Sequence, residues 1–209
     1  MTDPGIARRA ERLYLVRHGR TQLSARGAYS GRRDAPLTEE GREQARQVAE
    51  RLQGTGVDAV YSSPLSRAAD TARAIAEATG APLLVDERLT EVDYGPIEGF
   101  DRQTARERFS EAFQAWRDDP FGAPLAGMEP LPEAFARARD ATSEAIATAR
   151  CPVIVGHQGI LRLVLVALGG IDASEYFTTR FEEAAPLLID SPSVAQPPAR
   201  GPRPPDLQS

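Results

Sequence analysis

The chain has 209 residues, of which 41% are hydrophobic and 26% charged, and its formal net charge at pH 7 is -5. Length and composition predict one globular domain with a sizeable core rather than a fibrous or disordered chain. The acidic balance argues against nucleic acid as the main partner, because proteins that bind it usually carry a basic face.

Two further features concern the cellular setting. No apolar run reaches the roughly 18 residues that a membrane span needs, and residues 1–12 predict no signal peptide. Cys151 is the single cysteine, so an intrachain disulfide is excluded. A chain without disulfides fits a reducing compartment, and we therefore expect a cytoplasmic protein without a membrane partner.

Short apolar runs alternate with amphipathic segments along most of the chain. The patterns predict, in chain order, strand 13–16, loop 19–36, helix 38–53, strand 58–61, helix 65–79, strand 83–85, loop 86–100, helix 102–117, helix 132–150, strand 153–155, helix 160–168 and an edge strand 187–189. This alternation implies right-handed crossovers and a three-layer α/β/α domain with a mainly parallel sheet, covered on both faces. Residues 191–209 are rich in proline and show no apolar face, so we expect a disordered tail there.

Both histidines of the chain occupy the same kind of position. His18 follows the first predicted strand, His157 follows the strand at 153–155, and a glycine comes soon after each. Residues at the carboxyl ends of strands in an α/β sheet face the crevice where ligands bind. A lone histidine at a strand end is more often structural than catalytic, but two of them favour an enzyme.

Three further residues accompany the histidines. Arg17 precedes His18, Arg67 lies in the first turn of the helix at 65–79, and Glu91 lies in the loop at 86–100. Each of these regions follows a strand, so the side chains can converge at one edge of the sheet. A metal site is the weaker alternative, because neither histidine has a second ligand at suitable spacing and two arginines would repel a cation. We expect neither a metal nor a cofactor.

These motifs, together with the segments Asp34–Thr38 and Gly41–Ala45, resemble the histidine phosphatase superfamily, the phosphoglycerate mutase-like proteins. The resemblance runs from about Leu13 to about Leu168. It implies a phosphoglycerate mutase-like fold and one catalytic domain over residues 1–190. It also implies a small phosphorylated substrate, and it allows a homodimer, since dimers are common among relatives.

The resemblance assigns a role to each of the five residues. His18 would attack phosphorus in line, and water would then hydrolyse the phosphohistidine; neutral imidazole is available for this near pH 7. Arg17, Arg67 and His157 would surround the equatorial phosphoryl oxygens, where their charge would stand in for a metal ion. Glu91 would protonate the leaving oxygen and then activate water.

The resemblance implies further contacts around the phosphate. Ser24, Ser30 and the backbone of Gly31 would line the phosphate pocket, and Gln158 would contact the substrate. Thr21 matches a position that shapes the loop after His18.

Departures from the family pattern favour a phosphatase over a mutase. Arg20 stands where an acidic residue is common, Ser24 where asparagine is usual, and Ala28 where a basic residue is frequent. Val92 replaces the arginine that follows the catalytic glutamate in mutases, and residues 86–150 are too few for the long mutase insertion. Fewer cationic contacts and a shorter lid favour hydrolysis of the intermediate by water.

Three functions therefore stay open. The first is a metal-independent phosphomonoesterase of the phosphatase branch, the second a phosphoglycerate mutase, and the third a catalytically silent binding protein. Retention of all five core residues argues against the third. Arg102 could contact an anionic substrate, and Arg20 could add positive charge to the pocket mouth.

The remaining aromatic and sulfur side chains have plainer interpretations. Phe109, Phe113 and Trp116 form an apolar stripe at helical spacing, which is consistent with core packing or with a lid over the pocket. Packing is the favoured alternative. Cys151 begins a buried strand and is interpreted as a small hydrophobic residue rather than a nucleophile.

Overall fold

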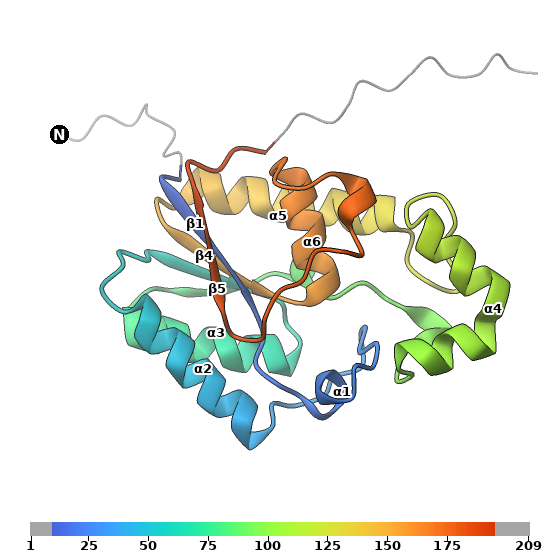
Figure 1. Ribbon diagram of the computed structural model, residues 1–209. Coiled ribbons are helices and arrows are strands. Elements are labelled where there is room, and N and C mark those ends of the chain that lie inside the picture. The colour runs from blue at the N-terminus through green and yellow to red at the C-terminus, as the bar shows by residue number, and fades with distance from the viewer. Residues whose placement is uncertain (1–9, 195–209) are drawn as a thin grey trace, which may run out of the picture.

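The computed structural model describes residues 10–194, and its centre is a five-stranded sheet of order β3-β2-β4-β1-β5 (Figure 1). Its strands are β1 (Arg12–Arg17), β2 (Ala59–Ser62), β3 (Leu83–Val85), β4 (Pro152–Gly156) and β5 (Pro186–Asp190). The first four run parallel, and β5 pairs antiparallel with β1. The predicted mainly parallel sheet with an edge strand near residues 187–189 is confirmed.

Helices cover both faces of the sheet, so the predicted three-layer α/β/α arrangement is confirmed (Figure 1). The α-helices are α1 (Gln22–Ala25), α2 (Glu39–Leu52), α3 (Ser66–Thr79), α4 (Arg102–Asp118), α5 (Leu131–Thr148) and α6 (Gln158–Ala167). Helices α2 and α3 pack on one face, and α5 and α6 on the other. Helix α4 lies at the far end of the molecule, beyond the sheet.

The two faces follow from the alternation of side chains along the strands. In β1, Leu13 and Leu15 point into the core shared with α5 and α6, whereas Tyr14 and Val16 point toward α2 and α3. All of these side chains are buried, which is why the central strands are continuous apolar runs in the sequence.

Three local details differ from the sequence predictions. The loop predicted at 19–36 contains the short helix α1, which a capping box of Thr21 and Ser24 begins. Four residues are too few to produce a hydrophobic period, so the pattern could not reveal this helix. The loop at 86–100 contains two 3-10 turns, Glu87–Leu89 and Gly95–Ile97, and a third, Ala173–Glu175, lies in a segment without a prediction. Other boundaries differ by one or two residues.

Helix α4 anchors the far end of the molecule to the core. Trp116 and Phe113 are buried, and their rings pack edge-to-face with each other. The aromatic stripe therefore packs in the core, which confirms the favoured alternative of the sequence analysis. Ser110 interrupts α4 with a φ of 29°, so the two halves of the helix meet at a kink.

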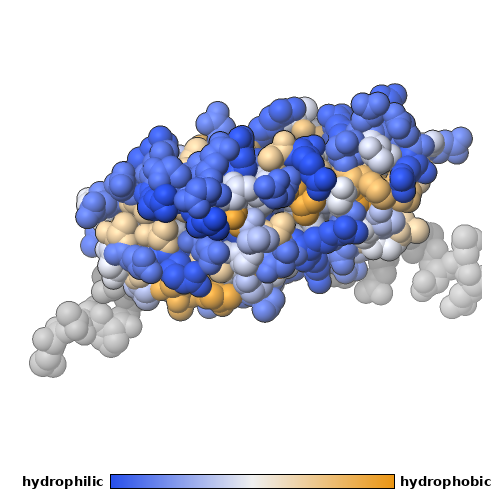
Figure 2. Space-filling model, turned by 90° about the horizontal axis from the view of Figure 1, so that it is seen from below, coloured by the Kyte–Doolittle hydropathy of each residue, from blue (hydrophilic) through white to orange (hydrophobic). Residues whose placement is uncertain are grey.

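The surface is mostly polar, and the face shown in Figure 2 is mainly hydrophilic with separate hydrophobic patches. Among the described residues, the large exposed hydrophobic side chains are Leu84 and Val85 on β3 and Leu187 and Leu188 on β5, the two edge strands. Within residues 10–194 no helix is both long and apolar enough to cross a membrane. Residues 195–209, most of the predicted disordered tail, lie outside the described residues, as do residues 1–9. The assignment of 1–190 to one domain stays a prediction.

Candidate active site

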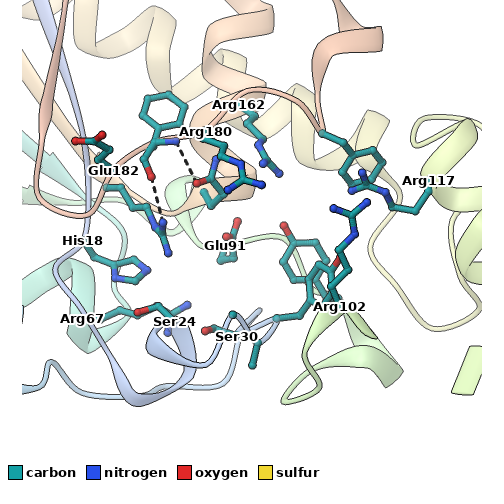
Figure 3. A pocket seen from close by; sticks show the side chains of 18 residues that line it. His18, Ser24, Ser30, Arg67, Glu91, Arg102, Arg117, Arg162, Arg180 and Glu182 are labelled. Atoms are coloured by element: carbon teal, nitrogen blue, oxygen red, sulfur yellow. Dashed lines mark hydrogen bonds between the residues drawn. The ribbon is translucent and has the colours of Figure 1, made fainter. Parts of the chain in front are cut away.

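A cavity of about 600 Å³ opens beside the carboxyl end of β1, where the predicted site residues meet (Figure 3). Most of the residues that line it are polar, charged or aromatic: Arg17, His18, Ser24, Gly27, Ala28, Tyr29, Ser30, Arg67, Glu91, Tyr94, Arg102, Arg117, Gln158, Arg162, Phe177, Arg180, Phe181 and Glu182. Arg17, His18, Arg67 and Glu91 thus share one cavity although they come from separate segments.

The backbone after His18 is held close to the start of α2. A side chain at Gly19 would collide with the carbonyl of Gly41, and one at Gly41 would collide with the backbone of Arg20. The Gly19 N–H donates to Thr71 Oγ1 at 3.1 Å. The two glycines of the sequence motifs therefore allow a close approach that fixes the position of His18.

His18 is buried at the cavity wall in a defined tautomer. Its Nδ1 lies 2.7 Å from the carbonyl oxygen of Gly19. Because a carbonyl can only accept, Nδ1 carries the proton and Nε2 keeps its lone pair. Burial lowers the pKa of His18 well below 6.5, and the charges of Arg17 and Arg67 lower it further. The side chain is therefore a neutral imidazole near pH 7, as a nucleophile requires.

Arg67 is completely buried, and three of its donors are fixed by the protein. Nε donates to His157 Nδ1 at 3.2 Å, Nη1 to the Arg33 carbonyl at 2.8 Å and Nη2 to the Gly31 carbonyl at 2.7 Å. A guanidinium has five N–H groups, so the same orientation leaves two for a ligand.

His157 lies behind Arg67 rather than at the cavity surface. Its Nδ1 accepts from Arg67, so Nε2 carries the proton and donates to Ser63 Oγ at 2.8 Å. The ring centroids of His157 and His18 are 5.1 Å apart. Burial and the charge of Arg67 hold the pKa of His157 well below 6.5. Both ring nitrogens of His157 bond to protein groups, so His157 supports Arg67 in this structure. The direct contact with phosphoryl oxygens that the resemblance implies stays a prediction.

Arg17 lines the cavity next to His18. Its Nη1 donates to the Phe181 carbonyl at 3.1 Å, and Nη2 lies 3.6 Å from Glu183. Its Nε is buried and has no hydrogen-bond partner among residues 10–194. Buried donors are nearly always paired, so an unpaired guanidinium N–H here marks a place for an anionic acceptor.

The carboxylate of Glu91 is oriented by backbone N–H groups. It accepts from Val92 at 2.9 Å and from Gly159 and Ile160, in the first turn of α6, at 3.0 and 2.9 Å. The positive end of the α6 dipole adds to these contacts. A side chain at Gly159 would collide with Tyr94 and Glu91, which explains the glycine after His157 in the sequence motif.

The other predicted contacts fall into two groups. Ser24, Ser30 and Gln158 line the cavity as expected, and so does Arg102. Gly31 is not part of the cavity lining; its carbonyl holds Arg67, and the Glu98 carboxylate fills the space beside it. Gly31 therefore positions Arg67 through its carbonyl, and its phosphate contact stays a prediction.

Two residues have partners that the sequence did not reveal. Gln158 bonds through its amide to the backbone of Thr179 and Phe181, so it fixes that wall of the cavity. Arg20 pairs with Glu40 at 2.8 Å and Glu183 at 3.0 Å and does not line the cavity. The expectation that Arg20 adds charge to the mouth is wrong, because two carboxylates neutralise it.

Sequence reasoning missed three cationic residues of the cavity, Arg117, Arg162 and Arg180. The sequence contains a signal for Arg162, because it is the one charged residue of α6 and lies one turn after Gln158, on the same side of the helix. Arg117 and Arg180 had none. The described residues contain no group of three or more His, Cys, Asp and Glu side chains that could hold a metal ion.

Comparisons with known proteins identify the family of this chain. The model of the histidine phosphatase superfamily (branch 1) matches residues 13–190. Phosphoserine phosphatase 1 of Hydrogenobacter thermophilus is 31% identical over 180 residues, 85% of this chain and 85% of that protein. The 2,3-bisphosphoglycerate-dependent phosphoglycerate mutase of Rhizobium etli is 38% identical over 131 residues, 60% of this chain and 62% of the mutase.

A solved structure extends the likeness to the whole fold. The mycobacterial glucosyl-3-phosphoglycerate phosphatase, in complex with VO3, superposes with a TM-score of 0.76 at 31% identity, covering 86% of this chain and 92% of that chain. The predicted phosphoglycerate mutase-like fold is confirmed. Sequence, fold and the family model agree, and the chain belongs to the histidine phosphatase superfamily.

Proposed function

We propose that this chain is a phosphomonoesterase that hydrolyses a small phosphorylated metabolite. The observation that carries the proposal is the neutral, buried imidazole of His18, which has an unprotonated Nε2 and lines one cavity together with Arg17 and Arg67. The similarity to phosphoserine and glucosyl-3-phosphoglycerate phosphatases supports the same class of reaction.

The reaction proceeds in two balanced steps. His18 Nε2 forms a bond to phosphorus while the ester P–O bond breaks, and the Glu91 carboxyl gives its proton to the leaving oxygen. Water then attacks the phosphohistidine, Glu91 takes a proton from that water, and the P–N bond breaks. The guanidinium groups of Arg17 and Arg67 stabilise the charge on the equatorial oxygens in both steps. His157 acts by orienting Arg67.

A phosphoglycerate mutase is the second candidate, because a mutase is among the similar proteins. Val92 is buried and apolar at the position after Glu91. It offers no charge to a substrate carboxylate there, which favours hydrolysis over transfer between two hydroxyl groups of one substrate.

The test compares phosphate release with isomerisation. Incubation with para-nitrophenyl phosphate and with 3-phosphoglycerate should release inorganic phosphate from both. Conversion of 3-phosphoglycerate to 2-phosphoglycerate without phosphate release would identify a mutase instead. Binding of phosphate esters without either reaction would identify a catalytically silent binding protein.

Trapping the intermediate tests the nucleophile itself. Reaction with labelled substrate and an alkaline quench should place the label on the peptide that contains His18. His18→Asn should reduce turnover by about a thousandfold or more with an unchanged circular dichroism spectrum. His157→Asn is the matched control: it should slow turnover while the label still appears on the His18 peptide. An active His18→Asn enzyme would refute the assignment.

A cytoplasmic location and a homodimeric state complete the proposal. The single cysteine supports the first, because a chain that cannot form an intrachain disulfide fits a reducing compartment. Dimers among relatives support the second. Cell fractionation and analytical ultracentrifugation test them separately, and a periplasmic protein or a monomer would contradict the respective part.

A further inference from the structure

Three arginines gather on the side of the cavity opposite His18. Arg102 and Arg117 come from the two ends of α4, and Arg162 comes from α6 (Figure 3). We call them the distal arginine cluster. Among residues 10–194, none of the three has a carboxylate within the 4.0 Å of a salt bridge, whereas Arg17, Arg20 and Arg137 each have at least one.

Neutral groups hold two members of the distal arginine cluster, Arg117 and Arg162, in place. The Arg117 guanidinium lies 3.7 Å from the centroid of the Phe177 ring. Arg162 donates from Nε to the Thr179 carbonyl at 2.7 Å and lies 5.3 Å from the centroid of the Tyr176 ring. Aromatic faces and a carbonyl orient these guanidinium groups without neutralising them, so their remaining N–H groups stay available to a ligand.

The three positive charges act on one another. Burial lowers the pKa of Arg117, and the charges of Arg102 and Arg162 lower it further. The Tyr29 hydroxyl, which also lines the cavity, lies in the field of all three. The carboxylates of the cavity wall are Glu91 and Glu182, and Figure 3 shows Glu182 on the side of His18. Clustered like charges destabilise a folded protein unless an anion binds to them, and such clusters therefore mark binding sites.

We propose that the distal arginine cluster binds a second anionic group of the substrate, a carboxylate or a phosphate. The preferred substrates are then phosphomonoesters that carry an anion at the end remote from the ester. This inference rests on the proposed function, because the ester end must face His18. Arg17 and Arg67 serve the transferred phosphoryl group, and the distal arginine cluster serves the other end of the same molecule.

The test uses substrate pairs that differ in the second anion. 3-Phosphoglycerate and glycerol 3-phosphate share a three-carbon frame, and a hydroxymethyl group replaces the carboxylate in the second. Fructose 1,6-bisphosphate and fructose 6-phosphate make the same comparison for a phosphate. In at least one pair, we expect kcat/KM for initial phosphate release to be about tenfold or more higher for the member with a second anionic group than for its partner. The pair that shows the larger ratio identifies the second anion.

Variants locate the preference. Arg117→Gln and Arg162→Gln should each reduce that ratio several-fold toward one, mainly through KM. Arg106→Gln is the matched control, because Arg106 is an exposed arginine of α4 outside the cavity, and it should leave the ratio unchanged. Thermal melting of each variant separates loss of binding from loss of the fold.

Other outcomes overturn the inference. Ratios near one for both pairs in the wild type, or an unchanged ratio in both cavity variants, would refute it while phosphatase activity stands. Calorimetry on the His18→Asn protein measures the affinity for each member of the same pairs without turnover, and so tests the preference for a second anionic group in binding alone. Tighter binding of the members with a second anionic group, with no hydrolysis by the wild type, would refute the proposed function. It would still support anion binding by the distal arginine cluster.

Discussion

The two buried histidines govern the response of this protein to acid. Burial and the neighbouring arginines hold the pKa of His18 and of His157 well below 6.5 in the folded state. In the unfolded chain both pKa values return to about 6.5. Below that pH the unfolded chain binds protons that the native side chains do not bind, so the histidines favour unfolding as pH falls. Above pH 6.5 both side chains are neutral in the folded and the unfolded chain, so they no longer reduce the free energy of unfolding.

This difference predicts the size of the pH effect. From pH 6.5 toward the lower folded-state pKa values, each histidine should reduce the free energy of unfolding by about 1.4 kcal/mol per pH unit. Urea denaturation at pH 7.5 and 5.5 measures the change. His157→Asn should lose about half as much of this stability as the wild type over that interval. An equal loss in both proteins would show that the histidines are not responsible.

At the scale of elements, α5 braces the loop that carries Glu91. Arg137 of α5 donates to the carbonyls of Arg88 at 2.7 Å and Thr90 at 2.5 Å. Glu129 receives two further bonds from Arg137, at 2.7 and 2.9 Å, and accepts the Asp93 N–H at 3.1 Å. Burial opposes the charge of Glu129, but the bonds from Arg137 outweigh it, and the pKa of Glu129 is lowered. One ion pair therefore fixes both sides of Glu91.

Loss of this brace should affect proton transfer more than binding. Arg137→Lys removes the planar fork, and we expect kcat for an alkyl phosphate to fall about tenfold to a hundredfold because Glu91 is displaced. Para-nitrophenyl phosphate should be less affected, since its leaving group needs little protonation. Arg139→Lys, which alters an exposed pair with Asp140, is the control. An equal loss for both substrates would indicate general destabilisation instead.

At the scale of the whole molecule, positive charge for the phosphoryl group comes from distant parts of the chain. Arg17 ends β1 and Arg67 lies in the first turn of α3, and both line the cavity with His18. Guanidinium groups at these places can stabilise the phosphoryl oxygens in the role that metal ions take in other phosphoryl-transfer enzymes.

This arrangement predicts metal independence. EDTA should leave the rate unchanged, whereas vanadate should inhibit, because it mimics the five-coordinate phosphorus of the transition state in a site built from cations. The measurement is phosphate release with and without each reagent. Activity that EDTA removes and magnesium or zinc restores would contradict this prediction.

The sequence by itself determined the layered fold and the reacting end of the site. Apolar runs marked the buried strands, and parallel strands bring the residues at their carboxyl ends, such as His18, to one edge of the sheet whatever the loops do. Thr38 marked the start of α2 and Gly80 the end of α3, because helix capping depends only on residues close in the sequence.

The tertiary structure decided the rest of the site. Arg117 and Arg162 line one cavity only because the fold brings parts of α4 and α6 to its wall, and no local pattern encodes the proximity of segments so far apart in the chain. Arg20 follows the catalytic histidine in sequence, yet Glu183, which is remote in sequence, neutralises it. His157 likewise accepts from Arg67 with Nδ1, because its Nε2 donates to Ser63, which is remote in sequence. Hydrogen-bond partners depend on which side chains the completed fold brings within 3 Å, and only the folded chain specifies them.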